Sequence, residues 1–558
     1  MNPETILHCL DCGHDHPYTP KQFTCPACGS AWREARYDYA GLSKTILSTW
    51  ASRPFAIWRY RELLPVRKPN PELTLGEGGT PLIRAVNLGM MLGCPNIYIK
   101  DERQGPTSSF KDRQAAVTIS ALKEAGITEM VVASTGNVSI SYSAYAARAG
   151  IKLWAFLTSL VPPEKMREVA LYGTQVIKVT GSYDQAKQVA AEFARQRNLF
   201  LDQGTRTITS VEAMKTIAFE AAEQLSWLKK DANGFPLPSP DWYFQSVSGG
   251  LGPLGVLKGF QEMQTMGLIG QIPRLGIIQA EGCSPMVQAW QEGKEIATPV
   301  SPRTRIATLA TGDPGRTYTL LFKNSRGGEG AYFESVSDED AFRTMHILAK
   351  MEGLSMEPAS AVAFAGMIKM VRNGIIKPSD TIVVNLTGHT VPIEQFILGE
   401  NWSRSVVVPS QPAAAVAEPV PQEGLLAALS HVTRDRFPRI AIVDDNPEVR
   451  RLIRRILQAQ GNYTLSEATN GREAIALAQN EHPDLMILDL MMPEVDGFGV
   501  LDALQKNKET AEIPVIVVTA KDLTKEERER LKGHIQSLMQ KGDFMSDELA
   551  DEVRSLIG

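Results

Sequence analysis

Short runs of apolar residues alternate with longer amphipathic segments over most of the chain. The runs at 130–133, 242–244 and 381–384 have the length and composition of buried strands. Between such runs lie segments whose apolar residues recur with helical spacing. This alternation predicts α/β layers with largely parallel sheets, and we expect one large domain over residues 41–400.

The same alternation returns after a stretch of different composition. Residues 401–437 are rich in alanine, proline and glutamate, which cannot build a core and predict a linker. Beyond it, a second domain is expected over residues 438–558. Its strand-like runs lie at 440–443, 485–488 and 515–518, and the polar residues at their carboxyl ends are Asp444, Asp445, Asp489 and Thr519. Because parallel strands end at one edge of a sheet, we expect these side chains to form a site there.

The composition argues against two classes of function. With 43% hydrophobic and 22% charged residues, the chain is ordinary for a globular protein, and no apolar run reaches the length of a membrane span. The net charge is −5 and the sequence has no block of basic residues, which argues against binding of nucleic acid. Residues 1–4 lack the features of a signal peptide. We therefore expect a cytoplasmic protein that binds neither membranes nor nucleic acid.

Four of the six cysteines crowd the first thirty residues as two Cys-x-x-Cys pairs, separated by twelve residues. They are Cys9, Cys12, Cys25 and Cys28. Four thiolates complete a tetrahedral zinc shell and leave no open position for catalysis. Two chance pairs or a redox dithiol are the alternatives, but paired knuckles at this spacing are typical of zinc. We expect a structural zinc in a ribbon over residues 1–40.

One lysine stands out in the stretch 106–113, Pro-Thr-Ser-Ser-Phe-Lys-Asp-Arg. Lys111 comes directly before a predicted helix that runs to Gly126, and a lysine in such a place can form a Schiff base with an aldehyde cofactor. Taken alone, an exposed lysine that starts a helix is the commoner case. Three further motifs change that balance: Ser-Thr-Gly-Asn at 134–137, a glycine cluster at 249–252 and Leu-Thr-Gly at 386–388.

In combination, these motifs resemble the pyridoxal-phosphate (PLP) enzymes of the threonine synthase group, over about residues 9–399. The resemblance implies a fold type II enzyme of two α/β subdomains, with PLP on Lys111 and its 3-oxygen held by Asn137. It places Thr387 at the pyridine nitrogen and makes Lys111 the general base at the substrate α-carbon. The turn that would hold the cofactor phosphate is Gly249, Gly250, Leu251 and Gly252. Pro253 has no N–H, so the number of phosphate donors stays open.

The same resemblance implies an amino-acid substrate whose carboxylate is held by Ser134, Thr135 and the backbone N–H groups that follow. Two departures bear on the choice of substrate. Val138 stands where the group usually carries threonine, and the segment 204–210 lacks the group's asparagines and closing arginine. We expect Arg206 to replace the missing arginine from a different position; a surface loop without that role is the alternative.

The reaction implied is conversion of O-phospho-L-homoserine and water to L-threonine and phosphate, by γ-elimination and β-hydration. Two other interpretations stay open. One is β-replacement or β-elimination on another amino acid, as in cysteate synthases or serine/threonine dehydratases. The other is a phosphorelay signalling protein whose PLP fold only senses an amino acid. We also expect the chain to form a homodimer.

The C-terminal domain carries a second set of motifs. Five residues have the spacings of a response-regulator receiver domain: Asp444, Asp445, Asp489, Thr519 and Lys541. The resemblance implies a flavodoxin-like fold in which Mg²⁺ is held by Asp445, Asp489 and the Met491 carbonyl. It also implies phosphorylation of Asp489 by a histidine kinase or a phosphotransfer protein. Leu538 at the usual aromatic position and Gly542 at a usual proline leave the mode of output open.

Overall fold

The computed structural model comprises two compact units, residues 1–425 and 426–558. It describes 5–134, 136–159, 161–228, 234–323, 330–389, 404–407, 437–460, 463–520, 523–540 and 546–557. Within these ranges, no helix is both long enough and apolar enough to cross a membrane.

A small antiparallel sheet in the order β2-β1-β3 opens the first unit. Its strands are β1 (Ile6–Cys9), β2 (Asp15–Pro17) and β3 (Arg33–Arg36). Leu7 and Ala35 are buried and join the main hydrophobic core of the unit. This small sheet belongs to the predicted cysteine ribbon, which therefore packs against the rest of this unit.

The larger sheet has the order β12-β11-β10-β13-β5-β4, and all its paired strands are parallel except β4 and β5. Its strands are β4 (Leu82–Arg84), β5 (Ile97–Asp101), β10 (Trp242–Ser246), β11 (Arg274–Ala280), β12 (Ala331–Val336) and β13 (Ile382–Leu386). Trp242 and Phe244 join one hydrophobic core, whereas Tyr243 joins the other. Burial on both faces explains why β10 reads as a continuous apolar run.

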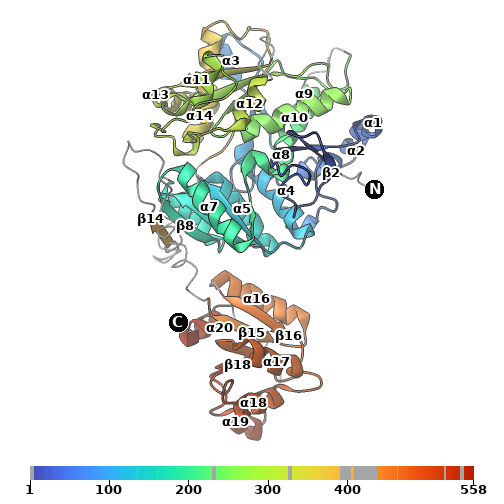
Figure 1. Ribbon diagram of the computed structural model, residues 1–558, viewed down its shortest axis with the longest axis vertical. Helices are drawn as coiled ribbons and strands as arrows, with labels where there is room; N and C mark the ends of the chain where they lie inside the picture. The colour runs from blue at the N-terminus through green and yellow to red at the C-terminus, as the bar shows by residue number, and fades with distance from the viewer. Residues whose placement is uncertain are drawn as a thin grey trace. The chain divides into compact units, whose positions relative to one another are not determined.

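The smaller sheet has the order β14-β8-β7-β6-β9 and is parallel throughout (Figure 1). Its strands are β6 (Glu129–Ser134), β7 (Lys152–Thr158), β8 (Gln175–Thr180), β9 (Phe200–Leu201) and β14 (Arg404–Val407). β14 falls inside the stretch 401–437 that was predicted to be linker. Residues 404–407 of that stretch are therefore part of the sheet, while 401–403 and 408–436 lie outside the described residues.

Helices cover both sheets. They are α1 (Tyr39–Leu42), α2 (Ile46–Ala51), α3 (Val86–Leu92), α4 (Lys111–Glu124), α5 (Asn137–Ala149), α6 (Pro163–Leu171), α7 (Tyr183–Arg197), α8 (Ile208–Met214), α9 (Thr216–Leu228), α10 (Leu251–Thr265), α11 (Pro285–Gln291), α12 (Arg316–Lys323), α13 (Asp338–Glu352) and α14 (Pro358–Arg372). On the larger sheet, α13 and α14 share the core of Trp242, and α9 and α10 share the core of Tyr243. Two helix-covered, largely parallel sheets confirm the predicted α/β layering.

The second unit is a single parallel sheet in the order β16-β15-β17-β18-β19 (Figure 1). Its strands are β15 (Arg439–Val443), β16 (Thr464–Ala468), β17 (Leu485–Leu488), β18 (Val515–Thr519) and β19 (Ser537–Gln540). Its helices are α16 (Pro447–Gln460), α17 (Gly471–Glu481), α18 (Gly497–Lys506), α19 (Lys525–Leu531) and α20 (Ser546–Ile557). α17 and α18 share one core with the sheet, and α16 and α20 share the other. The strand order confirms the predicted flavodoxin-like fold.

Candidate active site

Lys111 begins α4, and the segment before it pairs with the residues that follow β13. The N–H of Phe110 donates to the carbonyl of Thr387 at 3.0 Å, and the N–H of His389 donates to the carbonyl of Ser108 at 2.9 Å. This pairing brings Lys111 and Thr387 to one cavity of about 580 Å³, although 276 positions separate them in the chain.

The cavity collects most of the residues that the sequence singled out. Those that line it are Lys111, Asn137, Arg206, Gly249, Gly250, Leu251, Gly252 and Thr387. Ser134 does not line it: this residue is buried, and its hydroxyl oxygen accepts from the N–H groups of Gly136 at 2.9 Å and Ser139 at 3.2 Å. Thr135 lies outside the described residues. The predicted contact of Ser134 and Thr135 with a substrate carboxylate stays a prediction.

The glycine turn lies between β10 and α10. Gly250 has a φ of +85° and is the N-cap of α10. A β-carbon at Gly252 would lie 2.0 Å from the side chain of Gln245, whereas nothing lies within 4 Å of one at Gly249. The first N–H groups of a helix have no intrahelical partner and attract anions. The turn thus gives an anion close access to free backbone donors.

Asn137 is held by two charged residues that the sequence did not reveal. Its Nδ2 donates to Oε1 of Glu357 at 2.8 Å, and its Oδ1 accepts from Nζ of Lys165 at 2.6 Å. Lys165 and Glu357 are buried and form an ion pair at 2.9 Å. Because the lysine can only donate and the carboxylate can only accept, the pair fixes which end of the amide is which. The one local signal was Glu-Pro at the start of a helix, which marks no site by itself.

The ribbon gathers its four cysteines at one point. The sulfur atoms of Cys9, Cys12, Cys25 and Cys28 all lie within 4.8 Å of one another. Burial raises the pKa of the Cys9 thiol, but hydrogen bonds from the backbone of Cys12 and Asp11 lower it to about 6. Four sulfurs at this spacing fit a tetrahedral metal.

In the second unit, three carboxylates meet where the strands end. Oxygens of Asp444, Asp445 and Asp489 lie within 4.8 Å of one another, which fits a hard cation. The N–H of Met491 donates to Asp489 at 3.2 Å, and buried Thr519 ends the neighbouring β18. Lys541 lies outside the described residues, as does Gly542.

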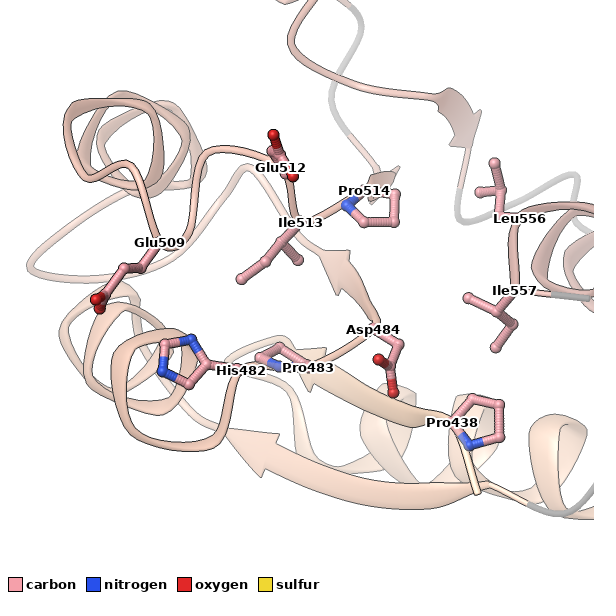
Figure 2. A pocket seen from close by; sticks show the side chains of 10 residues that line it. All are labelled: Pro438, His482, Pro483, Asp484, Glu509, Glu512, Ile513, Pro514, Leu556 and Ile557. Carbon is pink, nitrogen blue, oxygen red and sulfur yellow. The ribbon is translucent and has the colours of Figure 1, made fainter. Parts of the chain in front are cut away.

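A hollow of about 550 Å³ opens at the opposite edge of the same sheet (Figure 2). Pro438, Asp484 and Pro514 line it, and each comes directly before a strand. The hollow therefore lies at the edge where the strands begin, away from the carboxylates at the strand ends.

Two family models match the chain. Residues 73–388 match the model described as pyridoxal-phosphate dependent enzyme. The chain belongs to the pyridoxal-phosphate dependent enzyme family. Residues 440–554 match the response regulator receiver domain, which makes the second unit a receiver domain.

Threonine synthases are among the proteins that this PLP enzyme resembles. That of Methanocaldococcus jannaschii is 34% identical over 388 residues, which cover 69% of this chain and 92% of the relative. That of Methanosarcina acetivorans is 32% identical over 396 residues, which cover 70% and 93%. A solved structure, processed threonine deaminase isoform 2 from Solanum lycopersicum, is 18% identical with a TM-score of 0.47, covering 63% of this chain and 90% of that one. The family match and the threonine synthase relatives make the protein a threonine synthase-like, PLP-dependent lyase of fold type II that carries a receiver domain.

The cavity of this PLP enzyme fits the cofactor at both ends. Burial lowers the pKa of Lys111 to about 8, although Asp202 and Glu357 act in the opposite direction. At pH 7 roughly a tenth of such an amine is neutral, against about one part in 2,500 for an exposed lysine. The neutral amine is the form that attacks an aldehyde carbon. The open glycine turn suits the phosphate, so the aldehyde and the phosphate each have a partner in one cavity.

Thr387 offers a hydroxyl rather than a carboxylate to the same cavity. Its Oγ1 lies 2.8 Å from Oγ of Ser360, and the N–H of Gly388 donates to that Oγ at 3.0 Å. When bound, PLP supplies an electron sink for negative charge at the substrate α-carbon. The chain's own residues place Lys111 and Thr387 in the one cavity where such a ring would lie.

We expect the protein to contain about one equivalent of zinc per chain, lost in a Cys25→Ser/Cys28→Ser variant. The reason is that four close thiolates bind zinc, and two do not complete its shell. Elemental analysis of the purified proteins measures this. PLP content should survive the loss, because no cysteine lines the cavity. A Cys94→Ser variant, which changes a buried cysteine away from the ribbon, serves as control. A metal-free native protein or an iron–sulfur spectrum would contradict the prediction.

Proposed function

We propose that the PLP enzyme is a threonine synthase that converts O-phospho-L-homoserine and water to L-threonine and phosphate. The observation that carries this proposal is Arg206. Arg206 lines the cavity of Lys111, and its guanidinium has no acidic partner among the residues that the structure describes. Burial lowers the pKa of Arg206, yet a guanidinium stays charged in proteins. A cation in the same cavity as Lys111, with no acidic partner among the described residues, supports a substrate with a second anionic group, and O-phospho-L-homoserine has one.

Each proposed role follows from the chemistry of the side chain. Lys111 moves protons at the substrate α-carbon, and Asn137 donates to the 3-oxygen of the cofactor ring. The glycine turn binds the cofactor phosphate, and Thr387 contacts the pyridine nitrogen. Arg206 binds the substrate phosphate, and Ser134, Thr135 and the backbone N–H groups that follow hold the substrate carboxylate.

A phosphate-release screen tests the proposal. O-phospho-L-homoserine should give equal amounts of phosphate and threonine. In an Arg206→Gln variant, kcat/KM should fall about ten- to a hundredfold, because hydrogen bonds to charged groups contribute about 1.5–3 kcal/mol. Arg195→Gln is a matched control, since this arginine is exposed and pairs with Glu192. Release of phosphate at an unchanged rate in the Arg206 variant would contradict the assigned role.

One observation favours a second function. Val138 lines the cavity at the position where the group usually carries threonine. With valine in place of threonine, the cavity offers the substrate one hydroxyl group fewer, which suits β-replacement or β-elimination on another amino acid. The same screen therefore includes O-phosphoserine with and without sulfite, threonine and serine, with detection of keto acids. Turnover of one of these without turnover of O-phospho-L-homoserine would select this second function.

For the receiver domain we propose phosphorylation of Asp489 by a histidine kinase or a phosphotransfer protein. Mg²⁺ would be held by Asp445, Asp489 and the Met491 carbonyl, with Asp444 beside it. The close approach of the three carboxylates supports this. Thr519 and Lys541 would contact the phosphoryl group. We further propose that the whole chain forms a homodimer.

Phosphorylation of Asp489 is expected to change the turnover of the PLP enzyme about fivefold. Couplings of this kind are typically about 1–3 kcal/mol. We expect the low end, because exposed Leu538 replaces the usual aromatic residue. Turnover is measured with and without a small-molecule phosphodonor and Mg²⁺, and Asp489→Asn is the control. Identical turnover with phosphorylation confirmed would leave a receiver that only tethers a kinase or stores phosphate.

A further inference from the structure

The cysteine ribbon reaches the cavity of the PLP enzyme. Trp32 and Arg316 line the cavity together with Lys111. Trp32 follows the second cysteine pair by four positions, and Arg316 is the first residue of α12. The cavity wall thus includes both the ribbon and a distant helix.

Arg316 is bound by the ribbon through three contacts. Its Nη1 forms an ion pair with Asp11, and its Nη2 donates to the carbonyl of Leu10 at 3.4 Å. Its Cζ lies 5.5 Å from the ring centroid of Trp32. All three partners belong to the ribbon, so the position of this guanidinium depends on it.

Asp11 is itself held by the cysteine pairs. It lies between Cys9 and Cys12, and its second oxygen accepts from the hydroxyl of Ser30 at 2.5 Å. The oxygen of Ser30 in turn accepts from the N–H of Trp32 at 3.0 Å. Closure of the two cysteine pairs around one metal would therefore also fix Asp11 and Trp32 with respect to each other.

The helix of Arg316 also contacts the segment of Arg206. Oγ1 of Thr317 lies 2.9 Å from Oγ1 of Thr205, the residue before Arg206. Asp11 thus contacts Arg316, and the next residue, Thr317, contacts the residue that precedes Arg206. The cation of Arg316 is already neutralised, whereas that of Arg206 has no acidic partner within the described ranges.

We propose that Asp11 is a positioning residue for the PLP enzyme, acting through Arg316. By holding Arg316 in the cavity wall, it keeps the adjoining segment of Arg206 in place for the anionic end of the substrate. The inference rests on the proposed function of Arg206. It makes the ribbon a determinant of substrate affinity, in addition to a structural metal site.

Kinetics test the effect on the substrate. Asp11→Asn is expected to raise the KM for O-phospho-L-homoserine about three- to fivefold while kcat changes less than twofold, as befits a partly exposed ion pair. Asp15→Asn removes another exposed carboxylate of the ribbon, whose partner is His8, and should leave KM unchanged. In an Arg316→Gln background, Asp11→Asn should have no further effect. Additive effects of the two substitutions would overturn the route through Arg316.

Hydrogen exchange tests the coupling without any substrate. In Asp11→Asn, with zinc content confirmed, the peptide that covers 314–319 should exchange faster than in the native protein, and in Asp15→Asn it should not. If the Asp11→Asn variant loses zinc, the hydrogen exchange of the Arg316→Gln variant is the test instead. This variant removes the contact between Asp11 and Arg316 and leaves the ribbon intact. Unchanged exchange overturns the proposal. Native protein that releases no phosphate from O-phospho-L-homoserine refutes the proposed function instead, and the exchange result still decides whether the ribbon holds the cavity wall.

Discussion

Replacing Lys111 with alanine is expected to abolish covalent attachment of PLP and to lower turnover about a thousandfold or more. Two losses combine, since the methyl group can neither bind the cofactor aldehyde nor move a proton at the α-carbon. The fold should persist, because Lys111 forms no ion pair with a described residue and lies at the first position of α4. Asp202 and Glu357, the two carboxylates that raise the pKa of Lys111 in the native protein, remain in place in the variant.

Borohydride reduction followed by peptide mapping locates the lysine that carries the cofactor. The native protein should yield a pyridoxyl label on the peptide of Lys111, and the variant should yield none. Lys123→Ala is the matched control: this residue lies on the same helix, but its Nζ donates to the carbonyl of Ala149. A label on another lysine in the native protein would refute the assignment.

Replacing Glu220 with alanine is expected to lower the stability of the first unit by about 3–5 kcal/mol. Glu220 is fully buried between two cations, 2.6 Å from Nζ of Lys100 and 2.6 Å from Nη1 of Arg113. Burial raises the pKa of Glu220, but Arg113 and Lys100 lower it to about 2, so the carboxylate is ionised at neutral pH. Without it, Lys100 is a buried charge with no carboxylate partner among the described residues, whereas Arg113 keeps Glu102.

Urea unfolding followed by tryptophan fluorescence measures this loss, because all eight tryptophans precede residue 403 and report on the first unit alone. Glu339→Ala is the control: its ion pair with Arg305 is largely exposed, and such pairs contribute about 0–1 kcal/mol. Since Arg113 lies two residues after Lys111, the Glu220 variant should also bind PLP more weakly. Equal unfolding midpoints for the two variants would contradict the prediction.

Local patterns predicted the strands well. The apolar runs at 242–244 and 381–384 correspond to β10 and β13, and the run at 515–518 lies in β18. These strands are buried on both faces, so their sequences carry a strong and purely local signal. The motifs around Lys111 and Thr387 also predicted that both residues belong to one site, because each motif has a recognisable local sequence. Both residues line the same cavity.

Contacts over long sequence separations could not be predicted in this way. Glu357 lies 220 positions after Asn137, and Arg316 lies 305 positions after Asp11. A buried ion pair or a cavity wall depends on how the sheets bring distant segments together. The local sequence around a charged residue does not show which distant residue will be its partner. The strand β14 was missed for a related reason: its four residues adjoin a stretch rich in alanine and proline.

The position of β14 decides where the enzyme can be separated from its receiver. β14 pairs with β8, whose one other neighbour among the described strands is β7. A shortened chain that ends at Gly399 would lose β14 and leave the backbone groups of β8 unpaired, and such an open edge invites aggregation. Poor solubility of that fragment would then be mistaken for loss of activation by the receiver. A chain cut after Val407 keeps the edge covered and isolates the effect of the receiver alone.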